Sequence, residues 1–120
     1  MTASTDIRVA RVYDPPRPED GTRVLVDRLW PRGVKKADAA LDDWCRDVAP
    51  SNELRTWYGH VPERFAEFAD RYRAELADPP RADALASLRD TCRTGTVTLL
   101  TATKVLETSH ATVLAEVLST

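Results

Sequence analysis

The sequence predicts an α/β fold in which a short, mainly parallel sheet is flanked by helices. Two observations indicate this: the apolar, β-branched runs are short, and segments with helical spacing lie between them. Neighbouring parallel strands need a crossover of a dozen residues or more, so strands that alternate with helices favour a parallel sheet. At 120 residues the chain fits one domain, residues 1–120, in which we expect residues 1–6 to form a disordered tail.

Three segments have the character of strands. Ile7–Tyr13 alternates in polarity, which suits a strand near the edge of the sheet. Val24–Val26 is a continuous apolar run, and Thr96–Thr101 is rich in β-branched residues and follows a glycine, so both predict buried strands. Between the first two, Asp14–Gly21 contains three prolines, whose fixed φ and missing N–H predict a stiff loop.

Five segments carry apolar residues at helical spacing. The first runs from Asp38 through Val48 and places Trp44 and Cys45 on its apolar face. Gly59 is placed to end the second helix and Gly95 to end the fourth, because glycine readily takes the left-handed conformation. The predicted helices begin near Asp38, Ser51, Pro62, Asp78 and either Thr108 or Ser109.

Charge and cysteine usage exclude several classes of partner. The net charge is −2 and both signs are mixed along the chain, so no basic stripe is present for nucleic acid. The N-terminus lacks the pattern of a secretion signal and no apolar run is long enough for a bilayer, which predicts a cytoplasmic protein with no membrane partner. Cys45 and Cys92 lie far apart, each in a predicted helix, and are expected to be buried free thiols.

The first candidate site lies where the Arg23–Gly33 segment, R-V-L-V-D-R-L-W-P-R-G, changes from apolar to charged residues. Open α/β sheets place ligands beyond the carboxyl ends of their strands. Arg28 and Arg32 could clamp an anion, with Trp30 as a wall and Asp27 orienting an arginine or taking a proton. The alternative is a structural Asp–Arg network with Trp30 in the core.

The second candidate is the loop from Thr101 to His110. If Thr108 or Ser109 caps the last helix, Lys104, His110 and the positive end of that helix could converge on an anion. The alternative is ordinary capping beside a solvated lysine. The chain has neither the phosphate-binding loop nor the dinucleotide fingerprint, and no motif indicates a cofactor.

His60 is the third candidate, in a loop where an imidazole could act as a general acid or base. A surface or core histidine is the alternative. His60 and His110 could also hold a metal with a carboxylate, although their spacing is not that of a metal motif.

Three segments resemble the domain-of-unknown-function family 488, in its short YeaO-like branch: the stretch that begins at Tyr13 and includes D-R-L-W-P-R-G, the stretch L-R-T-W-Y-G-H from Leu54, and R-Y-R-A-E-L from Arg71. The resemblance implies a compact, cytosolic bacterial α/β domain in a family without an established activity. Its pattern falls on Asp27, Arg28, Trp30, Pro31, Arg32, Gly33, Trp57, Gly59, His60 and Lys104.

The loop before the last helix departs from that family pattern. Members of the branch commonly read L-L-Y-A-A-K-D there, whereas this chain has Thr101 for the tyrosine and Val105 for the aspartate. Longer relatives carry a cysteine, histidine and arginine group near the last helix, and this chain has no cysteine there. These differences argue against cysteine chemistry and carboxylate-assisted metal binding at this loop.

Three classes of function remain, and we favour binding of a small anionic molecule at the end of the Arg23–Gly33 segment. An enzyme would use His60 or His110 as acid or base and Asp27 as orienter, around an anion held by Arg28, Arg32 and Lys104. A non-catalytic module would carry or sense the anion or a metal ion. A protein-interaction domain would present Trp30, Trp57 and Tyr58 to a partner or to a second copy in a homo-oligomer.

Overall fold

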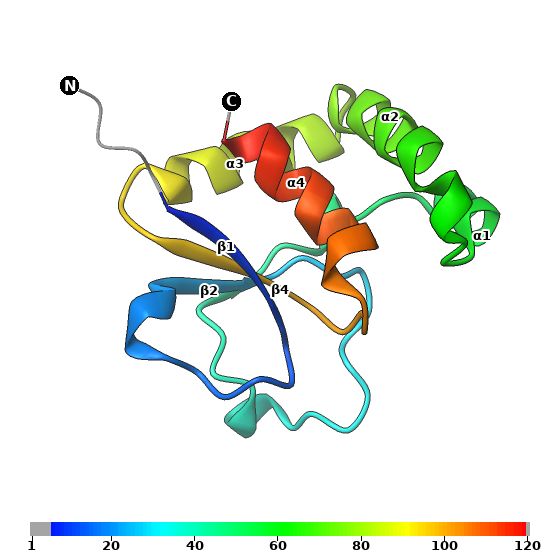
Figure 1. Ribbon diagram of the computed structural model, residues 1–120. Helices are drawn as coiled ribbons and strands as arrows, with labels where there is room; N and C mark the ends of the chain where they lie inside the picture. Colours follow the sequence, from blue (N-terminus) through cyan, green and yellow to red (C-terminus); the bar gives the residue numbers. More distant parts are fainter. Residues whose placement is uncertain (1–5, 120) are drawn as a thin grey trace.

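The computed structural model describes residues 6–119, which form a four-stranded sheet and four α-helices (Figure 1). The strands are β1 (Ile7–Arg11), β2 (Thr22–Leu25), β3 (Asp43–Trp44) and β4 (Val97–Thr101). Their order is β1-β4-β2-β3, and all three pairings are parallel. The predicted α/β class with a short parallel sheet is therefore confirmed, and β1 lies at the predicted edge.

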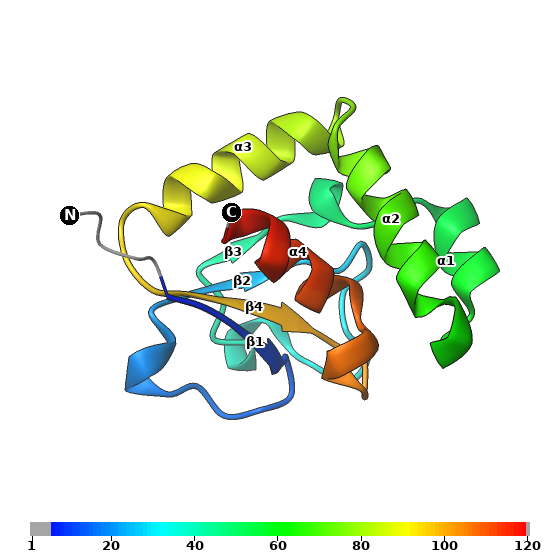
Figure 2. The same cartoon turned by 45° about the horizontal axis from the view of Figure 1, so that its top comes forward.

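The four helices cover one face of the sheet, and two long loops cover the other (Figures 1 and 2). The helices are α1 (Asn52–Tyr58), α2 (Phe65–Leu76), α3 (Arg81–Cys92) and α4 (His110–Leu118). The loop from residue 12 to residue 21 joins β1 to β2, and the loop from residue 26 to residue 42 joins β2 to β3.

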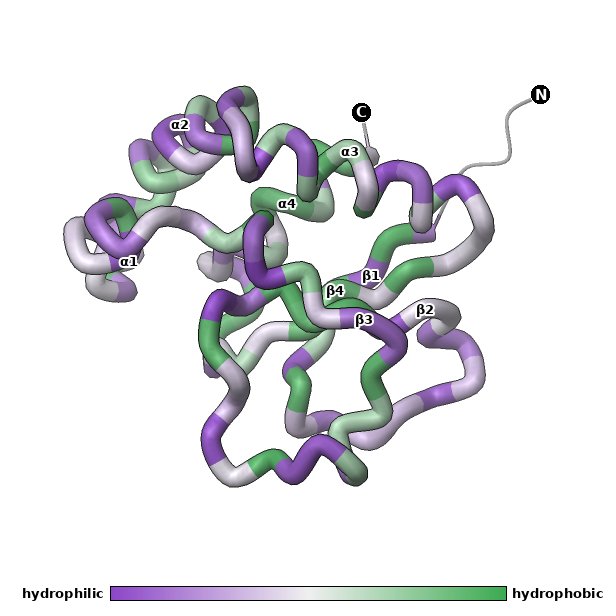
Figure 3. The backbone as a smooth tube through the Cα atoms, turned by 180° about the vertical axis from the view of Figure 1, so that it is seen from behind, coloured by the Kyte–Doolittle hydropathy of each residue, from purple (hydrophilic) through white to green (hydrophobic). Residues whose placement is uncertain are grey.

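The main core lies between the sheet and the helices. Side chains alternate along a strand, so Val24 and Leu99 face the helices whereas Leu25 and Leu100 face the two loops. Figure 3 shows hydrophobic residues along the strands and α4, as expected for elements buried between layers. Within this core the Tyr72 hydroxyl is satisfied, because it donates to the Val48 carbonyl oxygen at 2.6 Å.

The loop-covered face contains a buried ion pair between Arg23 and Asp20, whose side chains are only 6% and 9% exposed. Arg23 Nε also donates to the Ala40 carbonyl oxygen at 3.0 Å. Asp20, the other member of the ion pair, accepts a hydrogen bond at its carbonyl oxygen from the Thr98 hydroxyl at 2.7 Å. These contacts connect β2 and β4 to both loops and hold the loops against the sheet.

The predicted helix from Asp38 to Val48 is wrong. The segment contains two single 3-10 turns, Lys36–Asp38 and Arg46–Val48, with β3 between them. Trp44 packs in the cluster under the loops while Cys45 packs against the helices, so adjacent residues face opposite sides of the sheet. That is the period of a strand, and Cys45, predicted in a helix, instead donates its backbone N–H to the Leu25 carbonyl oxygen at 2.8 Å.

The other predicted elements are confirmed with shifted ends. Ser51 and Ser109 cap α1 and α4 by accepting hydrogen bonds from the amides three residues later, and Gly59 ends α1 in the left-handed conformation. Gly95 does not end α3, which stops at Cys92. Of the predicted tail, residues 1–5 lie outside the described residues, whereas the Asp6 carbonyl oxygen accepts a hydrogen bond from the Val97 amide.

Gly21 meets β4 closely, and we expect Gly21→Ala to destabilise the protein. A Cβ at this position would lie 2.1 Å from the Thr96 carbonyl oxygen, and its φ is +63°. Gly33→Ala is the matched control, because Gly33 has a φ of +77° but nothing within 4 Å. We expect a loss of about 1–2 kcal/mol for the control and a larger loss for Gly21→Ala. Equal losses in urea unfolding would show that the contact with Thr96 is unimportant.

Both cysteines are free, and we expect their thiols to react slowly in the folded protein. Burial, together with the charges of Asp43 and Asp47, raises the pKa of Cys45 to about 11, and burial raises the pKa of Cys92. A two-unit rise lowers the thiolate fraction at pH 8 by about 100-fold. Alkylation by iodoacetamide should therefore be slow in buffer and fast in urea. Fast reaction of Cys45 in buffer would contradict this.

Candidate functional site

Asp27 joins the carboxyl ends of β2 and β4 to the start of α4. Its Oδ2 accepts a hydrogen bond from the Ala102 amide at 2.8 Å. On its other side, His110 Nε2 lies 3.3 Å from Asp27 Oδ1 and 3.1 Å from the Val26 carbonyl oxygen. The structure thus brings together Asp27 and His110, two of the three predicted catalytic residues.

Local structure explains why these groups meet. The Val26 amide donates to the Leu100 carbonyl oxygen at 3.0 Å, which extends the pairing of β2 with β4 past the end of β2. Ser109 caps α4, so His110 is the first residue of that helix. The Tyr58 hydroxyl donates to the Thr108 carbonyl oxygen at 2.7 Å and fixes the approach to the helix.

The surroundings of the Asp27 carboxyl group favour its charged form. Burial alone raises the pKa of Asp27. Hydrogen bonds from His110, the Ala102 amide and Thr101, together with the charge on His110, lower the pKa by more than burial raises it. The pKa of Asp27 is therefore held below its usual range. The side chains of Asp27 and His110 are 16% and 13% exposed, so the pair is mostly shielded from water.

Two predicted ligand-binding cations lie beside this pair. Arg28 follows Asp27 directly, and Lys104 comes two residues after Ala102. Both are exposed, and neither makes an ion pair or a side-chain hydrogen bond within residues 6–119. The edge of the sheet thus carries two cations whose charge no neighbouring side chain neutralises.

Trp30 and Arg32 lie on the side of the sheet covered by the loops. Trp30 Nε1 donates to the Val34 carbonyl oxygen at 2.7 Å, and its ring packs edge-on against Trp44 with centroids 5.3 Å apart. Trp44 in turn donates from Nε1 to the Asp27 carbonyl oxygen at 2.7 Å. The Arg32 side chain is exposed, and its carbonyl oxygen accepts the Tyr13 hydroxyl at 3.2 Å. Trp30 is therefore part of the smaller core.

His60, the third predicted catalytic residue, is exposed in the turn after α1. Its φ is +58°, and its ring centroid lies 6.0 Å from that of Tyr58. Within residues 6–119, no hydrogen bond, ion pair or ring contact joins His60 to Asp27 or His110. The predicted group of two histidines and one aspartate therefore reduces to a pair.

The aromatic residues proposed for a protein-interaction surface are covered. Trp57 lies beneath the guanidinium groups of Arg64 and Arg71, at 5.5 Å and 4.3 Å from the ring centroid. Tyr58 is buried and stacks on Phe68 with centroids 4.3 Å apart. Tyr58 is therefore buried while Trp30 and Trp57 are partly buried, so the three rings do not form one exposed surface.

The described part of the chain holds no group of three or more His, Cys, Asp or Glu side chains that could bind a metal ion. Two hollows on the surface, of about 240 and 220 Å³, lie beside Arg23. Neither is lined by any of the seven predicted site residues.

Two arginines that were not among the predicted site residues have unusual surroundings. Arg11 Nε is buried without a hydrogen-bond partner in the described chain, and the guanidinium carbon lies 5.1 Å from the Tyr13 ring centroid. Arg23 is buried in β2. A signal for Arg23 is present in the sequence, because a charge that precedes an apolar strand run must be paired if it is buried.

We expect Asp27→Asn to destabilise the protein at pH 7 by about 1–3 kcal/mol, through the loss of a buried charged acceptor. Because folding lowers the pKa of Asp27, its contribution is present above the ordinary value of 3.8 and is lost as the pH falls through the folded value. The difference between the two proteins in urea unfolding should therefore shrink at pH 3. A difference independent of pH would contradict the role of the charge.

None of the helices in residues 6–119 combines the length and apolar character needed to cross a lipid bilayer.

The chain is similar to bacterial proteins that are themselves uncharacterized. It is 54% identical over 119 residues to the uncharacterized protein Rv3073c of Mycobacterium tuberculosis. The matched region covers 99% of this chain and 98% of that relative. It is 45% identical over 112 residues to the uncharacterized protein YeaO of Escherichia coli, with 92% and 95% covered.

No solved structure matches the chain significantly. A family model described as the inactive DUF488-N3 subclade matches residues 6–120, nearly the whole chain. This model and the similarity to YeaO confirm the resemblance drawn from the D-R-L-W-P-R-G segment. The chain belongs to the DUF488 family, in its inactive N3 subclade.

Proposed function

We propose that this protein is a non-catalytic domain that binds a small anionic molecule at the carboxyl edge of β2 and β4. The observation that carries the proposal is the contact of Asp27 with Ala102 and His110, which brings the chain segments that carry Arg28 and Lys104 to the same edge. Both cations are exposed and lack a side-chain partner in the described chain. They are therefore free to bind a carboxylate or a phosphate.

The charge around this edge supports an anion over a cation. Arg28 lies at this edge, and the segment that continues from it to Lys36 contains three further cations and no acidic residue, in a chain whose net charge is −2. Asp27 cancels only one of these charges, so the four cations and one carboxylate from Asp27 to Lys36 sum to +3. The positive end of the nine-residue helix α4 lies at the same edge.

Three features support binding without catalysis. The matching subclade is described as inactive. His110 Nε2 and the Asp27 carboxylate are engaged with backbone groups as well as with each other. The Ser109 hydroxyl, the nearest in sequence to His110, donates to the Leu106 carbonyl oxygen at 2.8 Å and caps α4, so it is held by a structural role.

A second candidate function is binding of an acidic partner protein. The observation in its favour is that Leu29 and Val105, the neighbours of Arg28 and Lys104, are 67% and 53% exposed. Exposed apolar residues beside unpaired cations are typical of an interface. This function would use the same edge but would require no affinity for small ions.

We expect phosphate or citrate to raise the melting temperature of the wild type, because a ligand that binds only the folded state stabilises it. At 100 times Kd the gain is about 2.7 kcal/mol, and each kcal/mol is about 4–8 °C for a small domain. Arg28→Ala and Lys104→Ala should lose the shift. Arg93→Ala is the control: it is exposed, precedes β4 and so lies at the opposite edge.

Two results would overturn small-anion binding. The first is that neither phosphate nor citrate shifts the melting temperature of the wild type. The second is an equal loss of the shift in Arg93→Ala, which would indicate a general effect of charge. Binding of an acidic protein that is lost in Leu29→Ser, without any shift by small anions, would favour the second candidate.

A further inference from the structure

Two hollows on the surface share a single buried cation, and neither is lined by Arg28 or Lys104 of the edge site. Arg23, Asp14 and Pro15 line both of them, on the sheet face that the loops cover. The larger, of about 240 Å³, lies between the loop after β1 and the loop after β2. Arg23 is therefore placed to meet a molecule in either hollow.

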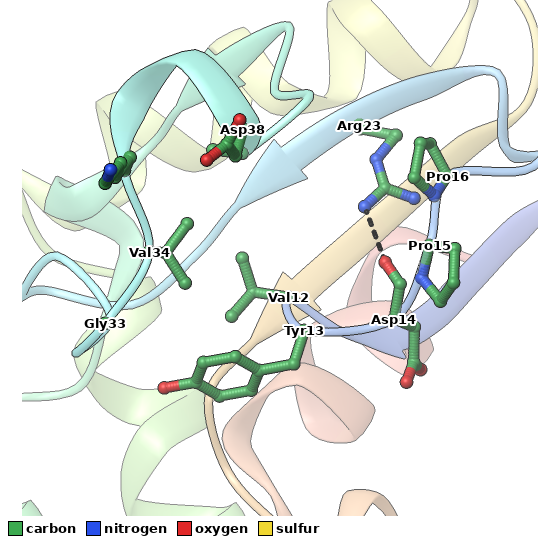
Figure 4. A pocket seen from close by; sticks show the side chains of 11 residues that line it. Val12, Tyr13, Asp14, Pro15, Pro16, Arg23, Gly33, Val34 and Asp38 are labelled. Atoms are coloured by element: carbon green, nitrogen blue, oxygen red, sulfur yellow. Dashed lines mark hydrogen bonds between the residues drawn. The ribbon is translucent and has the colours of Figure 1, made fainter.

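The walls of the larger hollow are stiff. Pro15 and Pro16 form one side, and their rings fix the backbone φ. The Tyr13 hydroxyl donates to the Arg32 carbonyl oxygen, which ties one loop to the other. Figure 4 shows Val12, Val34 and Tyr13 on one side of the hollow, with Arg23 and the two prolines on the other. A ligand would meet a preformed shape, which reduces the entropy lost on binding.

The buried guanidinium group keeps unused donors. Its five N–H groups serve Asp20, the Ala40 carbonyl oxygen and, at 3.5 Å, the Asp14 carbonyl oxygen. At least two N–H groups therefore remain for an acceptor in the hollows. An oxygen that accepts from them would bind beside a buried cation.

The rim of the larger hollow carries opposite charges that do not pair. Lys35 and Asp38 both line it and are both exposed, and no ion pair joins them in the described chain. Asp14 adds a second carboxylate, one oxygen of which accepts the Arg11 amide at 3.2 Å. A molecule carrying both an anionic and a cationic group would complement this rim better than a simple anion would.

We propose that the hollow between the two loops binds a small zwitterion of the amino-acid type. Its carboxylate would accept from Arg23 and Lys35, its ammonium group would face Asp14 or Asp38, and its carbon chain would contact Val12 and Val34. A hollow of about 240 Å³ is smaller than the roughly 300–1,000 Å³ clefts that hold drug-sized ligands, so it suits a molecule of this size.

Adjacent lysines provide a matched test. Lys35 lines the hollow, whereas its exposed neighbour Lys36 does not. We expect at least one of the twenty free α-amino acids, added singly in a thermal-shift screen, to raise the melting temperature of the wild type and of Lys36→Ala. Calorimetry should show affinity at least 10-fold weaker for Lys35→Ala. Both variants keep Arg23 and Asp20, so neither removes the buried ion pair.

The ligand's two charges are tested separately with the amide, which lacks the carboxylate, and the N-acetyl derivative, which lacks the ammonium group. Both should bind more weakly than the free amino acid. The proposal is overturned if no amino acid binds, if the two lysine variants behave alike, or if acetate binds equally well. Arg28→Ala should retain this binding, so failure here is distinguishable from failure of the edge site.

Discussion

The buried ion pair of Arg23 and Asp20 is the interaction on which the loop-covered face depends. A charge taken out of water is costly unless it is paired and its remaining N–H groups are satisfied. Arg23 meets most of this requirement, because it pairs with Asp20 and donates to a carbonyl oxygen of each loop, which leaves two of its five N–H groups without a partner in the described chain. The Asp20 carboxylate also accepts from the Arg17 amide, and its carbonyl oxygen accepts from the Thr98 hydroxyl. Each loop contains only a single 3-10 turn and no strand or α-helix, so this polar contact holds the loops against the sheet.

Asp27 performs a comparable task at the other end of β2. Asp20 precedes the strand and accepts from the Arg17 amide, while Asp27 follows the strand and accepts from the Ala102 amide. In both, hydrogen bonds to the charged form hold the pKa of the carboxyl group below its usual range. At both ends of β2, a carboxylate with little exposure to water connects the strand end to another segment. This connection is a structural role and requires no catalysis.

Much of the fold could be predicted because parallel pairing follows from strands that alternate with helices. The segment from Asp38 to Val48 could not, since its apolar spacing also fits a helix and only pairing with β2 decides for a strand. Asp27 could be singled out by the rule for carboxyl ends of strands, whereas its contact with His110 depends on where α4 packs against the sheet. The exposed position of His60 and the partners of Arg23 depend on loop and helix packing, which leaves no local signal in the sequence.

The position of β4 has a consequence for how the chain folds during synthesis. β4 is the last strand in the sequence, yet it lies between β1 and β2 and pairs with both. A nascent chain that has emerged only as far as α3 contains β1 and β2 but not the strand that joins them. The sheet can close only late in translation, so contacts between distant residues, rather than local ones, set the rate of folding.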